Sequence, residues 1–334
     1  MSDQVPNAKE RYIGALLGMA IGDALAMPAA GLSREQITER YGKITGYRPK
    51  LDENGEVIEE AGQFSADTEL ALCLAETIVT ANGFVDPEIA GERFIQVMRG
   101  PQAHFLSETT RASLKRADES GDFQGGVVDD RGEAHPAARS IPVALAHALS
   151  ESNPELVVRE VMRSVLITHA GLEIVNAALA VSHAMRLIIR REVPPEVLIG
   201  EVLAFIDEDD VARHLRKARR IIDGETEAGD EPETLARLAD APESQAALAA
   251  AFYLFAMYPD EFETAVLKAA NLGGGLHSVG SIVGAFAGAH VGASNIPKHL
   301  IEGLEGRMYF LMAAPTLLRT AQQRGGLFFH LQQS

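Results

Sequence analysis

Two segments of this sequence repeat glycine at every fourth position. Gly14, Gly18 and Gly22 form the first set. The second set lies near the other end of the chain and has four members: Gly280, Gly284, Gly288 and Gly292. Four-residue spacing places each set on one face of a helix, although glycine inside a helix costs nearly 1 kcal/mol relative to alanine. Close approach of two helix backbones would offset that cost, so we expect the two helices to pack against each other.

The rest of the chain is also helical in pattern. Apolar residues recur at three- and four-residue spacing, as in "EVMRSVLITHAGLEIVNAALAVSHAMRLIIRR", and strict alternation is almost absent, which predicts an all-α protein. A third helix should start near Ala66 and join the glycine helices through small residues at Ala71 and Ala75. The exception is "YRPKLDENGEVIEE", where Asn54 and Gly55 would supply the two positive φ angles of a tight turn in a small surface hairpin.

Composition narrows the classes of partner and compartment. The 47 acidic and 30 basic residues give a formal charge of -17, which repels nucleic acid and anionic membranes, so neither is an expected partner. The start "MSDQVPNAKERY" lacks a basic segment leading into an apolar one, which predicts a cytoplasmic protein. The lone Cys73 excludes an intrachain disulfide and any multi-cysteine metal site. No linker separates independent units, so we expect a single domain over residues 1–334.

Several polar residues fall at the ends of the expected helices. Ser65 is suited to cap the helix that starts near Ala66, and Asp67 in its first turn complements the helix dipole. If the three helices pack together, the polar groups at their ends converge on one site: Asp23, Ser65, Asp67, His277 and Ser278.

Two further residues have a structural and a functional interpretation. His169, in "LITHAGLE", follows an apolar helical run and is either a buried or capping histidine or a ligand contact. Arg139, in "HPAARSIPVAL", is either half of a surface ion pair or a fork for a phosphate.

The order of five segments resembles the ADP-ribosylglycohydrolase family, which includes the dinitrogenase-reductase-activating glycohydrolases and the jellyfish J1 crystallins. The segments are "GALLGMAIGDALAMP", "GQFSADTELAL", "AARSIPVAL", "THAG" and "FETAVLKAANLGGGLHSVGSIVGAFAGAHVG", and the match runs from about residue 11 to residue 307. The resemblance implies an all-α orthogonal multi-helix bundle, a binuclear magnesium or manganese site, and removal of ADP-ribose from protein side chains.

This sequence departs from the family at the metal motifs. The family's Thr-Asp-Asp-Thr motif reads Ser65-Ala66-Asp67-Thr68, and its Asp-Thr-Asp-Thr motif reads Gly275-Leu276-His277-Ser278. Ala30 stands where many members carry a catalytic glutamate, and Ala134-His135-Pro136-Ala137 replaces a run of small residues before Arg139. With three carboxylates lost from these motifs, we expect no binuclear magnesium site. At most one transition-metal ion would remain, held by Asp67 and His277.

The resemblance still assigns roles to individual residues. Asp67 and His277 are the candidate catalytic pair. The candidate ligand-binding residues are Asp23, Ser65, Thr68, Arg139, His169, Gly273, Gly274 and Ser278. The expected partner is ADP-ribose, a related nucleotide or ribosyl compound, or an ADP-ribosylated protein.

Three functions remain open on the sequence. The first is a pseudoenzyme that binds such a ligand without hydrolysing it. The second is a divergent glycosidase that cleaves an N- or O-glycosidic bond with Asp67 and His277. The third is a structural or assembly role like that of the crystallin relatives.

Overall fold

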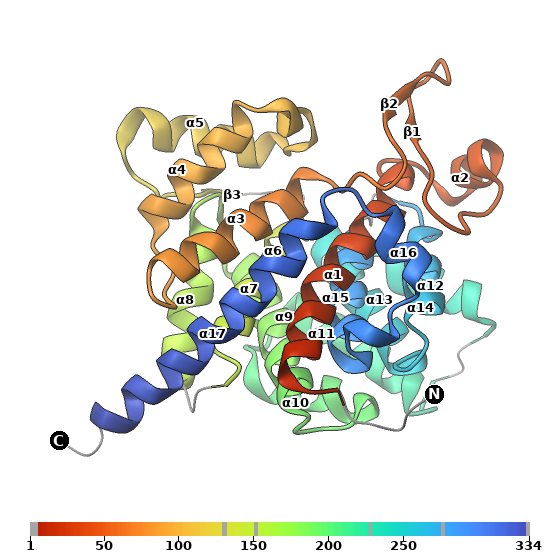
Figure 1. The fold of residues 1–334 in the computed structure, drawn as a ribbon. Coiled ribbons are helices and arrows are strands. Elements are labelled where there is room, and N and C mark those ends of the chain that lie inside the picture. The colour runs from red at the N-terminus through yellow and green to blue at the C-terminus, as the bar shows by residue number, and fades with distance from the viewer. Residues whose placement is uncertain (1–5, 129–131, 150–152, 227–228, 275–277, 332–334) are drawn as a thin grey trace.

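The computed structural model describes residues 6–128, 132–149, 153–226, 229–274 and 278–331, and helices dominate throughout (Figure 1). The all-α prediction is confirmed. The helices of the first half are α1 Ala8–Ala26, η1 Met27–Ala29, α2 Arg34–Tyr41, α3 Ala66–Thr80, α4 Pro87–Met98, η2 Pro101–Phe105, α5 Glu108–Ser120, α6 His135–Arg139, α7 Ile141–Ala146 and α8 Pro154–Leu166. Those of the second half are α9 Leu172–Arg190, η3 Pro195–Val197, α10 Leu198–Phe205, α11 Asp210–Ile222, α12 Glu231–Ala239, α13 Glu243–Met257, α14 Phe262–Ala270, α15 Ser278–Val291, η4 Ala293–Asn295, α16 Lys298–Gly303 and α17 Arg307–Leu331.

The two glycine-faced helices, α1 and α15, pack against each other as predicted. They run antiparallel, with Gly14 against Gly288 and Gly22 against Gly280. A Cβ added to Gly18 would lie 2.0 Å from the carbonyl oxygen of Gly284, so only glycine allows the backbones to come this close. Gly292 does not belong to this face: α15 ends one residue earlier, and Gly292 has a φ of +80°.

The expected place of the third helix was wrong. α3 packs mainly against α4, α6, α7 and α17, and it meets α1 near its own N-terminal end. In Figure 1 it runs above α17, on the same side of the molecule as α4 and α5. The small residues Ala71 and Ala75 are buried in those contacts instead of facing α15.

The hairpin prediction is confirmed, but its turn differs. Strands β1 Lys50–Leu51 and β2 Val57–Glu59 pair antiparallel and project beside α2 (Figure 1). Gly55 has a positive φ of 84°, whereas Asn54 is not among the residues with positive φ. The turn is longer than two residues because the Asp52 carboxylate accepts hydrogen bonds from the backbone of Asn54 and Glu56.

A second pair of short strands positions His169. β3 Val127–Val128 lies parallel to β4 His169–Ala170. A Cβ on Gly126 would lie 2.4 Å from the backbone of His169, so this glycine lets the two segments close on each other.

Two segments are long and apolar enough to cross a membrane: Ala8–Ala29 and Leu172–Arg190. Their apolar windows are 100% and 83% buried, respectively, inside the protein. Burial of this degree is what central helices of a folded core show.

Candidate active site

Asp23 joins the end of α1 to the start of α3. Its Oδ2 accepts hydrogen bonds from the backbone N–H of Ser65 at 3.0 Å, the Ser65 hydroxyl at 2.9 Å and the Thr68 hydroxyl at 2.5 Å. Ser65 is the N-cap of α3 and accepts from the N–H of Asp67. Of the residues predicted to converge, Asp23 and Ser65 are in direct contact, and Asp67 joins them through its backbone N–H. The Asp23 side chain is fully buried, and these donors from Ser65 and Thr68 satisfy its Oδ2.

Asp67 lies in the first turn of α3 and faces α6. Its charge raises the pKa of both His135 and Arg139, against burial, which is the larger influence and lowers both. The balance leaves a pKa of about 4 for His135 and about 10 for Arg139. At neutral pH the site therefore holds a neutral imidazole and a charged guanidinium beside this carboxylate.

His135 belongs to a buried group of one carboxylate and two imidazoles: Glu133, His135 and His169. His169 Nε2 donates to Glu133 Oε2 at 3.0 Å, and His135 Nδ1 lies 3.4 Å from the same oxygen. Burial is the largest single influence on Glu133 and raises its pKa, but hydrogen bonds from His169 and Ser107 and the electrostatic effect of the two histidines together outweigh burial and lower the pKa to about 2. Glu133 is therefore ionised at neutral pH.

Arg139 is buried, so its interpretation as a surface ion pair was wrong. Its Nη2 donates to the Thr168 hydroxyl at 2.6 Å and to the Ser164 carbonyl at 3.3 Å. The guanidinium carbon lies 5.1 Å from the ring centroid of Phe94. Its Nε and Nη1 are buried and have no hydrogen-bond partner within the described ranges, which leaves two donors of a buried guanidinium unsatisfied.

The glycine loop before α15 is partly described. Gly273 and Gly274 both have φ near +70°, and Gly274 donates its N–H to the carbonyl of Leu32. Ser278 begins α15 and is buried, two residues before the contact between Gly280 and Gly22. That places it at the same end of the helix pair as Asp23. His277 lies outside the described residues.

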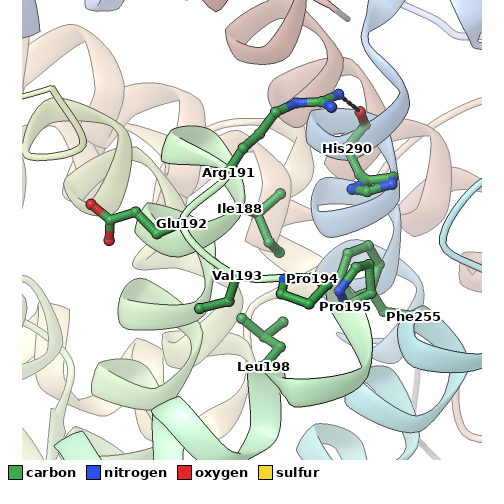
Figure 2. Close-up of a pocket in the computed structure, with 9 residues that line it drawn as sticks. All are labelled: Ile188, Arg191, Glu192, Val193, Pro194, Pro195, Leu198, Phe255 and His290. Atoms are coloured by element: carbon green, nitrogen blue, oxygen red, sulfur yellow. Dashed lines mark hydrogen bonds between the residues drawn. The ribbon is translucent and has the colours of Figure 1, made fainter.

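A pocket occupies the other end of α15. It is lined by Ile188, Phe255 and His290 among others, and Arg191 Nη2 donates to the carbonyl of His290 at 2.9 Å (Figure 2). His290 is twelve residues beyond Ser278, roughly 18 Å along a helix. The side chain of Glu192 points away from the pocket centre (Figure 2). This pocket is therefore separate from the polar site around Asp67.

A family model for ADP-ribosylglycohydrolases matches residues 4–326, nearly the whole chain. The chain belongs to the ADP-ribosylglycohydrolase family. The match is wider than the range expected from the motifs, residues 11 to 307. Members of this family act on ADP-ribosylated proteins or ADP-ribose substrates and are metal-dependent in general.

Individual relatives agree with the assignment. An uncharacterized protein of Archaeoglobus fulgidus is 30% identical over 90% of this chain and 93% of its own. The ADP-ribosyl-[dinitrogen reductase] glycohydrolase of Rhodospirillum rubrum is 24% identical over 90% and 92%. The ADP-ribosylarginine hydrolase Tri1 of Pseudomonas putida is 27% identical over 95% and 80%. A solved ADP-ribosylglycohydrolase-related protein complex superposes with a TM-score of 0.73 at 27% identity, covering 94% of this chain and 99% of that one.

The residues at the metal motifs do not fit the binuclear magnesium site of an ADP-ribosylglycohydrolase. Ala66 is fully buried and offers no oxygen ligand from its side chain. The hydroxyls of Ser65 and Thr68 both donate to Asp23, and as neutral ligands they would not replace the negative charge of the lost carboxylates. Of the carboxylates in the two motifs only Asp67 remains. Two hard cations need several more oxygen ligands than this.

Glu133 and His135 were missed as candidate site residues. His135 was noted only as a departure from the family pattern. The available signal was the Glu-x-His spacing in "GEAHP" before Arg139. In the structure, one ligand atom from each of these two residues lies within 4.8 Å of one from His169. The expected loop before Arg139 is the short helix α6, which buries His135.

Proposed function

We propose that this ADP-ribosylglycohydrolase family member cleaves the glycosidic bond of an ADP-ribosyl or ribosyl compound without a binuclear magnesium centre. The observation that carries the proposal is the position of Asp67, which retains its family place and lies close enough to Arg139 and the buried His135 to raise the pKa of both. Burying ionisable groups costs free energy, so their retention together favours a chemical role for the site.

The residues of the site suit different roles in this reaction. Glycoside hydrolysis passes through a transition state with positive charge on the sugar, which a carboxylate stabilises. Asp67 carries such a negative charge, at the position that the family motif retains. Arg139, whose Nε and Nη1 remain available, suits the phosphates of an ADP-ribosyl group. Asp23 acts indirectly, since it positions Ser65 and Thr68 at the start of the helix that carries Asp67.

The names of the relatives guide the choice of substrate. Two of them are named for hydrolysis of ADP-ribosylarginine or of ADP-ribosylated dinitrogen reductase. The test is therefore release of ADP-ribose from an arginine-ADP-ribosylated protein, measured with excess magnesium and in magnesium-free buffer. We expect equal release in both, and loss of at least roughly 100-fold in Asp67→Asn, as for removal of one charge-stabilising group.

A matched control is available in α4. Glu88 occupies the second position of that helix, as Asp67 does in α3, but is exposed. Glu88→Gln should leave the rate unchanged. Release that requires added magnesium, or that Asp67→Asn leaves intact, would contradict the proposal.

The loss of three carboxylates favours a second candidate, binding without hydrolysis. Calorimetric titration with ADP-ribose separates the two. Saturable binding by a wild-type protein that releases no ADP-ribose would identify a reader of the family ligand and exclude the glycosidase.

A further inference from the structure

Glu133, His135 and His169 form a compact set of potential metal ligands. One ligand atom from each residue can be chosen so that all three lie within 4.8 Å of one another. We propose that these residues hold one divalent transition-metal ion, in a site distinct from the family's magnesium motifs. The inference does not depend on the proposed glycosidase activity, because metal binding is measured directly.

The ligand chemistry indicates the class of ion. Two imidazole nitrogens and one carboxylate oxygen suit zinc, iron or a similar transition metal, whereas magnesium prefers oxygen ligands alone. Three protein ligands also leave positions open for water or substrate, as catalytic metal sites do.

The spacing of the ligand atoms fits such an ion. Glu133 Oε2 lies 3.0 Å from His169 Nε2 and 3.4 Å from His135 Nδ1. Ligand atoms about 2.0 to 2.2 Å from a tetrahedral ion are roughly 3.3 to 3.6 Å apart. Small rotations of the side chains would therefore place an ion between these three atoms.

Each ligand is oriented by a threonine hydroxyl on its other side, as ligands at metal sites usually are. These second contacts hold the imidazoles and the carboxylate in place without occupying the atoms that face one another. The three pairs are His135 Nε2 with Thr110 Oγ1 at 3.1 Å, His169 Nδ1 with Thr168 Oγ1 at 2.9 Å, and Glu133 Oε1 with Thr109 Oγ1 at 3.3 Å.

The hydrogen bonds around His169 can accommodate the change of proton that metal binding needs. Without metal, Nε2–H donates to Glu133 and the Thr168 hydroxyl donates to Nδ1. With metal on Nε2, the ring proton moves to Nδ1 and donates to Thr168 Oγ1. That oxygen also accepts from Arg139, and its two lone pairs allow both bonds.

The test is titration of metal-stripped protein with zinc by calorimetry. We expect one zinc ion per chain with submicromolar affinity and no magnesium binding at millimolar concentration. Glu133→Gln and His169→Asn should each weaken zinc binding at least roughly 100-fold, and Thr110→Val, which removes only an orienting hydroxyl, about 10- to 100-fold. Circular dichroism verifies that each variant is folded.

His299 provides the matched control. It pairs with Glu263 at 2.9 Å on the surface, so His299→Asn also breaks a histidine–carboxylate pair but should not change zinc affinity. Zinc binding that survives both Glu133→Gln and His169→Asn, or that is lost in His299→Asn, would overturn the proposal.

A measurement on the wild-type protein removes dependence on the variants. Cobalt is a paramagnetic substitute for zinc, and protons close to it are strongly shifted in the NMR spectrum. Each ligated imidazole would retain one exchangeable N–H proton, so the cobalt-loaded protein should show two shifted exchangeable signals. The absence of these signals would also overturn the proposal.

Discussion

The hydroxyl of Thr68 donates a 2.5 Å hydrogen bond to Asp23, a residue 45 positions earlier in the chain. Together with the two bonds from Ser65, it ties α1 to the first turn of α3. The carboxylate that the family pattern retains in α1 therefore serves here as the acceptor that orients the start of α3.

Replacing Asp23 by alanine should destabilise the protein by about 3 kcal/mol or more. The change leaves three buried donors without an acceptor, and hydrogen bonds to a charged group contribute about 1.5 to 3 kcal/mol each. Urea denaturation measures the effect. Asp52→Ala is the control, since Asp52 also accepts backbone hydrogen bonds but lies on the exposed hairpin. An equal loss in both variants would show that Asp23 has no special structural role.

Gly18→Ala should be among the most damaging single-methyl additions. The new Cβ would lie 2.0 Å from the carbonyl oxygen of Gly284, so α1 and α15 would have to separate. Overpacking of this kind costs about 3 kcal/mol. Thermal and chemical denaturation of Gly18→Ala should be compared with Gly46→Ala, where a Cβ meets no atom within 4 Å. A melting temperature unchanged from wild type would contradict the close approach of the two helices.

Buried histidines should make the free energy of unfolding decrease as the pH falls below 6.5, which is above the range where carboxylates titrate. Burial, aided by the charge of Arg324, lowers the pKa of His147 to about 2, from 6.5 in the unfolded chain. As pH falls below 6.5 the unfolded state takes up a proton that the folded state does not, so stability decreases by up to about 1.4 kcal/mol per pH unit.

His147→Gln isolates this contribution. Glutamine can still accept the hydrogen bond from Arg324 Nη1 but does not titrate. Unfolding free energies measured between pH 7.5 and 5 should fall less steeply in this variant than in wild type. The exposed His299, replaced in the same way, is the control. Identical slopes in wild type and His147→Gln would mean that His147 does not remain neutral in the folded protein.

Restoring the family carboxylates should restore magnesium affinity. The triple change Ala66→Asp, Gly275→Asp and His277→Asp returns the three charges missing from the two motifs. Calorimetry should detect magnesium binding to the triple variant and none to wild type. Ala66→Asp alone should bind none and should be less stable, because it places an unpaired carboxylate at a fully buried position. A folded triple variant without magnesium affinity would show that more than these carboxylates was lost.

The part of the fold that sequence predicts well is the part governed by local spacing. Gly18 and Gly284 lie on regular four-residue faces, and the cost of helical glycine requires a close neighbour, which made α1 and α15 predictable as a pair. The cap at Ser65 follows from side-chain chemistry within one turn. Gly292 continued the same spacing but lies past the helix end, so periodicity alone placed the boundary too far.

The candidate site was only partly accessible from sequence. Asp23 and Ser65 could be brought together because they lie at the ends of helices that were expected to meet. Glu133 and His135 could not, because their meeting with His169 depends on the pairing of β3 with β4 and on the burial of α6. The partners of α3 were also wrong, since Ala71 and Ala75 fit any closely packed neighbour equally well.

The closest contacts between α1 and α15 are made by main-chain atoms of the facing glycines. The closest contacts at this junction involve no side chain, so they persist when residues elsewhere in the helices are exchanged, as long as the glycines stay. Asp23 and Ser278 are carried at one end of that junction, so the positions of the site are set independently of which groups occupy them. Carboxylates can then be replaced by alanine, glycine or histidine over generations while the geometry that presents a new set of groups is inherited intact.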